Sequence, residues 1–204
     1  MNKQIVTLAI ITSIFFAACS GDVPKQDKAA TPKPSDTAMQ EALADATIIQ
    51  PLVASVDPKL SAQVQSIYNA YLQIKTALIS GKSKEAASSA TATNNLTKEF
   101  DVTGIPLDQI KAYQMHSAAI LETSANIAGT QDIKVQRDYF SVLSQHIFEL
   151  MKNYGADKTI YQEHCPMAFD GKGAFWLSDE VNIRNPYFGD EMLECGEVTN
   201  VIKK

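Results

Sequence analysis

The chain has 204 residues, of which 45% are hydrophobic and 20% charged, and its formal net charge is −5 at pH 7. This composition fits one domain with a hydrophobic core, together with processing and linker segments. The negative charge argues against a nucleic-acid-binding protein, which needs a basic stripe on its surface. We therefore expect no nucleic-acid partner.

Residues 1–18 are predicted to be a secretory signal peptide, because residues 5–16 are apolar but too few to span a membrane comfortably. The stretch Phe16-Ala-Ala-Cys19 resembles the bacterial lipobox, in which the cysteine is acylated, with phenylalanine where leucine is usual. We therefore predict a lipid anchor at Cys19 that holds the protein to a membrane. The alternative is cleavage after Ala18, which leaves a secreted protein without an anchor.

The predicted location is the bacterial cell envelope, on the periplasmic face of the outer membrane, because Ser20 rather than aspartate follows Cys19. Residues 19–56 are predicted to be the lipid anchor and a flexible linker. Three prolines between Ser20 and Asp36 lie among small and polar residues, and no apolar period appears there. The folded domain is expected at residues 57–204.

Four helices are predicted in the first part of this domain, because apolar residues recur at spacings of three and four. Aspartate or proline stands at three of the four predicted starts, serine at the other, and glycine at three of the four predicted ends. The predicted helices cover residues 57–80, 83–100, 106–128 and 132–154. Short connections between successive helices force them to be antiparallel, so we expect an all-α, up-down bundle of about four helices.

The sequence changes character after Thr159, where prolines and glycines interrupt the chain. We expect an irregular C-terminal cap rich in cysteine and methionine that rests on one end of the bundle. Residues 197–202 are expected to form either a final strand or an extended tail. No alternating strand pattern is found before Thr159.

Soft and borderline metal-binding side chains gather in this cap, and we consider them a candidate metal site. Thiolates and thioethers suit Cu(I), and an imidazole suits copper and zinc. The cysteine and methionine of each pair lie two or three residues apart, so both can face one ion. The candidate ligands are Cys165, Met167, Met192 and Cys195, with His164 as an auxiliary ligand.

The alternative for Cys165 and Cys195 is a disulfide, since an oxidising compartment favours one and small irregular caps are often crosslinked. The two hypotheses are compatible, because reduction of the disulfide would free the thiolates for Cu(I). Zinc is less favoured, because no Cys-x-x-Cys pair is present. His116 and His146 are expected to be boundary histidines of their helices, each making one hydrogen bond.

Four motifs of the cap resemble a known domain-of-unknown-function family. They are Cys165-Pro-Met-Ala168, Gly173-Ala-Phe-Trp-Leu-Ser178, Asn185-Pro-Tyr-Phe-Gly189 and Met192-Leu-Glu-Cys-Gly196. That family occurs in bacterial lipoproteins and at the C-terminal end of CusB-type copper/silver-efflux membrane-fusion adaptors. The resemblance implies a helical bundle in a metal-linked context, and carried over to the motifs it names Cys165, Met167, Met192 and Cys195.

The sequence therefore predicts an envelope lipoprotein that binds Cu(I) or Ag(I), for buffering or for transfer to a metal-efflux adaptor. The alternative function is a structural or protein-interaction module in which Cys165 and Cys195 form a disulfide and no metal binds. No arrangement of a nucleophile with a base, no phosphate-binding loop and no distinctive carboxylate pair is found, so we expect no enzymatic activity.

Overall fold

The computed structural model describes residues 43–204. The predicted signal peptide and Cys19 lie outside the described residues. Within residues 43–204, no helix combines the length and the apolar character needed to cross a membrane.

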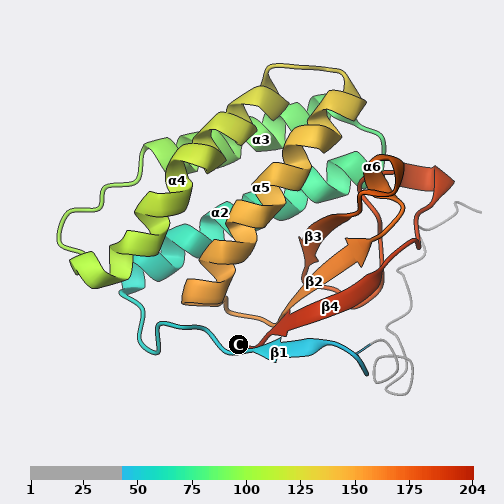
Figure 1. Ribbon diagram of the computed structural model, residues 1–204. Helices are drawn as coiled ribbons and strands as arrows, with labels where there is room; N and C mark the ends of the chain where they lie inside the picture. Colours follow the sequence, from blue (N-terminus) through green and yellow to red (C-terminus); the bar gives the residue numbers. More distant parts are fainter. Residues whose placement is uncertain (1–42) are drawn as a thin grey trace, which may run out of the picture. The chain divides into compact units, whose positions relative to one another are not determined.

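Four helices form the up-down bundle that the sequence predicts (Figure 1). They are α2 (Pro58–Ile79), α3 (Ser83–Lys98), α4 (Leu107–Ala128) and α5 (Ile133–Tyr154). Each helix packs on the next one in the sequence, and α2 also packs on α5. The predicted bundle is therefore confirmed.

The ends of these helices follow from local chemistry. The side chain of Asp57 accepts hydrogen bonds from the backbone at the start of α2, and the side chain of Asp132 does the same for α5. Gly81 and Gly155, which follow α2 and α5, have φ angles of 67° and 69°. Only glycine adopts this backbone conformation without strain, so each glycine ends its helix where the sequence predicts.

The C-terminal part is a four-stranded sheet, which corrects the all-α prediction and the irregular cap. Its strands are β1 (Thr47–Ile49), β2 (Ile160–Cys165), β3 (Ala174–Ser178) and β4 (Glu197–Ile202). The strand order is β1-β4-β2-β3, with β1 parallel to β4 and the other pairs antiparallel. The short helix α6 (Ala168–Gly171) joins β2 to β3, and the 3-10 turn η1 (Gly189–Glu191) lies before β4.

Strand β1 lies in the stretch that we expected to be part of the linker, and it contradicts the absence of strands before Thr159. Thr47 pairs with Asn200, and Ile49 pairs with Ile202. Three residues are too few to show a period of two, and the partner strand is distant in the sequence. Strand β4 confirms the first of the two alternatives for residues 197–202.

The sheet packs on α2 and α5, which places the cap beside the bundle (Figure 1). The Tyr71 hydroxyl on α2 accepts a hydrogen bond from the backbone N–H of Leu177 on β3, at 2.9 Å. The rings of Phe140 and Trp176 both lie close to Tyr187, which follows β3 in the chain. These aromatic contacts join the bundle and the sheet into one hydrophobic core.

Candidate metal centre

The sheet brings the two cysteines of the cap together. Cys165 ends β2, and Cys195 precedes β4, which pairs antiparallel with β2. The pairing of His164 with Glu197 therefore places Cys195 beside Cys165. The two Sγ atoms are 2.6 Å apart, with Cys165 buried and Cys195 half-buried. The sequence predicted this pair, and the structure places it in contact.

Asn185 holds the loop that carries Cys195, although the sequence suggested only a turn former. Its buried side chain donates a hydrogen bond to the backbone carbonyl of Cys195 at 2.8 Å and accepts one from the N–H of Tyr187 at 2.8 Å. Its backbone N–H donates to the carbonyl of Leu193 at 2.7 Å. One buried side-chain amide therefore gives hydrogen-bond partners to a backbone carbonyl at Cys195 and to a backbone N–H at Tyr187. The Asn-Pro dipeptide predicted a turn, but it did not predict this hydrogen bond to Cys195.

The spacing of the two sulfur atoms has a chemical consequence. Two metal–sulfur bonds of about 2.3 Å would hold the sulfur atoms roughly 3.8 Å apart or more. A metal therefore needs the two side chains to rotate apart, whereas a disulfide needs them to move closer. The hydrogen bond with Cys165 and partial burial raise the pKa of the Cys195 thiol, and the backbone N–H of Met167 opposes this rise. The metal-free structure therefore favours the protonated thiol at Cys195 over the thiolate.

The two predicted methionines lie next to Cys195 and open to solvent. The N–H of Cys195 donates to the carbonyl of Met192 at 3.2 Å, and the backbone N–H of Met167 faces the Cys195 sulfur. The exposed fractions are 55% for Met167 and 37% for Met192. Methionine usually fills cores, so two exposed thioethers beside a thiol are unusual.

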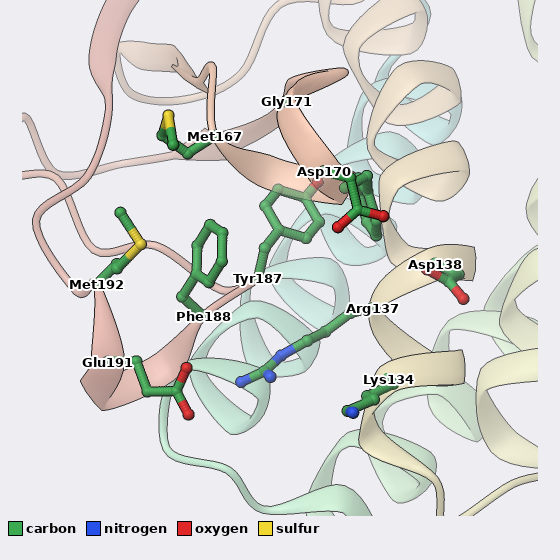
Figure 2. A pocket seen from close by; sticks show the side chains of 11 residues that line it. Lys134, Arg137, Asp138, Met167, Asp170, Gly171, Tyr187, Phe188, Glu191 and Met192 are labelled. Atoms are coloured by element: carbon green, nitrogen blue, oxygen red, sulfur yellow. The ribbon is translucent and has the colours of Figure 1, made fainter.

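Both methionines line an open pocket of about 920 Å³ between α5, α6 and η1. Figure 2 shows them beside Phe188, at the opposite side of the view from Lys134 and Asp138 of α5. Two residues of α6 in the wall, Phe169 and Asp170, have positive φ angles of 53° and 58°. Such backbone strain often marks a binding site, and here it shapes the turn after Met167.

His164, the predicted auxiliary ligand, is not brought to the cysteine pair. It precedes Cys165 in β2, and successive side chains of a strand point to opposite faces. The imidazole stacks on the ring of Phe175, its partner on β3, with ring centroids 4.3 Å apart. It also covers Gly173, where a Cβ atom would approach His164 Nε2 to 2.6 Å. The structure therefore gives His164 a packing role on the other face of the sheet.

Arg137 on α5 attaches the cap to the bundle and forms part of the pocket wall. Its Nε donates to the carbonyl of Pro186 at 2.8 Å, and its Nη2 donates to the carbonyl of Leu78 at 3.3 Å. Burial is the main influence on the guanidinium and lowers its pKa, and the charge of Glu191 opposes this shift. The side chain therefore joins three segments: α5, the end of α2 and the loop before Cys195.

Replacing Arg137 with methionine should lower the free energy of unfolding by about 2 kcal/mol, because hydrogen bonds from charged donors contribute about 1.5–3 kcal/mol. Urea unfolding followed by circular dichroism measures this change. Lys134→Met is the matched control, since Lys134 lines the same pocket from the first turn of α5. An equal effect of the two substitutions would contradict the anchoring role of Arg137.

Two buried titratable side chains, one on the bundle and one on the sheet, were not predicted from the sequence. Lys75 on α2 and Glu163 on β2 are buried, and Lys75 Nζ donates to Ser178 Oγ at 2.9 Å. Burial raises the pKa of Glu163 to about 8, while the charge of Lys75 opposes that rise. The Glu163 carboxylate and the Trp176 indole N–H face each other without a hydrogen bond of normal geometry. The signal was Lys75 itself, which lies in the apolar stripe four residues after Tyr71.

Residues 43–204 contain no cluster of three or more His, Cys, Asp and Glu side chains arranged to hold a metal. A metal at the cysteine pair must therefore take its other ligands from the methionine thioethers or from solvent. The residues present fit a soft ion, for which thiolate and thioether are suitable donors, better than zinc or magnesium.

The fold and the site define a helical-bundle domain whose C-terminal sheet holds a cysteine pair next to a methionine-lined pocket. Residues 67–159 match the family model of DUF3347, described as a protein of unknown function, and this stretch is thus similar to that family. The match runs from within α2 to the residue before β2, so it covers most of the bundle and ends before Cys165. Comparison with curated proteins and with solved structures found no significant match.

Proposed function

We propose that this protein is an envelope lipoprotein, anchored through Cys19 on the periplasmic face of the outer membrane, that binds Cu(I) or Ag(I). The metal would be buffered or passed to a metal-efflux adaptor, and we propose no enzymatic activity. The observation that supports this function is the contact of Cys165 with Cys195 beside two exposed methionines that adjoin Cys195. Soft ions prefer these donors, and a site open to a pocket allows exchange.

Binding would begin from the reduced pair. Both thiols lose their protons, the Sγ atoms separate, and the ion takes the place between them. Met192 shares the loop of Cys195, and Met167 follows Cys165 by two residues, so each thioether can approach the ion without movement of the sheet. Cys165 is fixed by β2, whereas Cys195 lies outside a strand and is the more adjustable ligand.

A competitive Cu(I) titration of the reduced protein tests this proposal. We expect the parent protein to take Cu(I) from a colorimetric chelator and Cys165→Ser/Cys195→Ser to take none. Met167→Leu/Met192→Leu should weaken binding, while Met115→Leu should not, because Met115 is more exposed than either but lies on α4, away from the cysteines. Equal metal retention by the parent and the double cysteine variant would reject the proposal.

The second candidate function is an interaction module stapled by a disulfide, which the 2.6 Å contact of the sulfur atoms favours. The two cysteines are 30 residues apart, and closing such a loop contributes about 3–4 kcal/mol in the chain-entropy model. In this case the pocket would receive a segment of an envelope protein. Absence of Cu(I) binding after full reduction, together with a large loss of stability on reduction, would favour this candidate over the metal site.

A further inference from the structure

Two histidines far from the cysteine pair meet between α4 and α5. Nδ1 of His116 on α4 is 3.0 Å from Nδ1 of His146 on α5, and the ring centroids are 5.3 Å apart. Both side chains are half-buried, so each ring has one side against the helices and one toward solvent. The sequence predicted two separate boundary histidines, and the structure shows one pair.

We propose that His116 and His146 form a second metal site, for a divalent transition-metal ion that binds neutral imidazole, such as Cu(II) or Ni(II). Neutral imidazole is a suitable ligand for these ions. The site is separate from the cysteine pair and does not depend on the function proposed for it.

The distance between the two nitrogen atoms carries this assignment. With metal–nitrogen bonds of about 2.0–2.1 Å, two imidazoles at a right angle have their nitrogen atoms roughly 2.9 Å apart, and at a tetrahedral angle roughly 3.4 Å apart. The observed 3.0 Å is the length of a hydrogen bond between the two rings, so a metal that replaces the shared proton needs little movement of either ring.

The helices hold the pair at this spacing before any metal arrives. Ile120, one turn after His116, and Ile147, directly after His146, are fully buried in the shared core. Tyr154 on α5 accepts a hydrogen bond from the backbone N–H of Tyr113 on α4, at 2.9 Å. The two ligands therefore lie on packed helices rather than on loops, which keeps the cost of ordering them low.

The surroundings leave the remaining coordination positions to water. The charged side chains that act on His116 are His146 itself, Glu149 and Lys152. Glu149 is engaged with Lys152 at 2.9 Å, so their charges compensate each other. Because only two protein ligands are present, the expected site is open and exchanges its metal readily.

Isothermal titration of the full chain with Ni(II), which does not oxidise thiols, tests the site. Replacing either histidine by asparagine should weaken binding by more than the roughly 10–100-fold that removal of a supporting outer-shell group costs. His164→Asn is the matched control, since it removes the remaining one of the 3 histidines. Electron paramagnetic resonance with Cu(II) should show two coordinated nitrogen atoms in the parent protein and in His164→Asn.

Loss of the nitrogen signal and of Ni(II) affinity in His116→Asn and in His146→Asn alone would support the site. Unchanged Ni(II) affinity in both variants would overturn it, and so would an equal loss in His164→Asn. Circular dichroism of each variant shows that the helices remain, which separates loss of a ligand from unfolding. The Cys165→Ser/Cys195→Ser variant should keep Ni(II) binding even if it loses Cu(I), so the two sites can fail independently.

Discussion

Replacing Lys75 with methionine should lower the free energy of unfolding by about 1–3 kcal/mol, the usual cost of leaving a buried polar group without its hydrogen-bond partner. Lys75 on α2 is buried, its Nζ donates a hydrogen bond to Ser178 Oγ on β3, and the charge of Glu163 acts on its pKa. Without the lysine, Ser178 Oγ loses this partner, and the pKa of the buried Glu163 carboxyl group rises further because no positive charge opposes the effect of burial. Urea unfolding followed by circular dichroism measures the loss.

A double variant distinguishes the pair from the packing around it. Lys75→Met/Glu163→Leu should recover most of the loss, because apolar replacement of a whole buried pair is often neutral or stabilising. Lys158→Met is the matched control, since Lys158 pairs with Asp179 near the surface, where such pairs contribute about 0–1 kcal/mol. If Lys75→Met cost no more than Lys158→Met, the pair would have no special role in attaching β2 to the bundle.

Replacing Gly196 with alanine should cost about 2–4 kcal/mol and disturb the cysteine pair, because two unfavourable terms add. The φ angle of Gly196 is 151°, which side chains rarely adopt. An added Cβ atom would lie 2.8 Å from the Trp176 ring and 3.0 Å from the carbonyl oxygen of His164. Relief of this clash requires a shift of the chain next to Cys195. The measurements are urea unfolding and the rate at which the two thiols oxidise.

Gly81→Ala separates the two terms. Gly81 also has a positive φ, 67°, but no atom lies within 4 Å of the Cβ position. This substitution should cost about 1 kcal/mol, from backbone strain alone, and should leave thiol oxidation unchanged. Equal costs at Gly81 and Gly196 would mean that the close approach of Gly196 to the sheet does not determine the position of Cys195.

The candidate site was predicted in part from the sequence. Cys165, Cys195 and the two methionines were recognised by their chemistry, and the structure brings them to one side of the cap. His164 was included because it adjoins Cys165 in the sequence. In a strand, however, neighbouring side chains point to opposite faces, so adjacency separates them. The position of the His164 side chain could be predicted only once residues 160–165 were known to form a strand.

The buried pair and the histidine pair were missed for a different reason. Each joins residues that are far apart in the chain, Lys75 with Glu163 and His116 with His146. A single lysine in an apolar stripe predicts that a partner exists, but not which residue it is. Likewise, the period of a helix gives the face on which a histidine lies, but the rotation of two helices against each other is set by their packing.

By itself the sequence determined the four helices and their ends, because these depend on contacts within a few residues. Aspartate caps, glycines with positive φ and apolar spacings of three and four act locally. Only the tertiary structure decided the sheet, in which β1 and β4 pair across most of the chain. Strands gain their hydrogen bonds from distant partners, so the local sequence of short strands between glycines and prolines does not predict the sheet. The metal-binding geometry depends on that sheet and on helix packing.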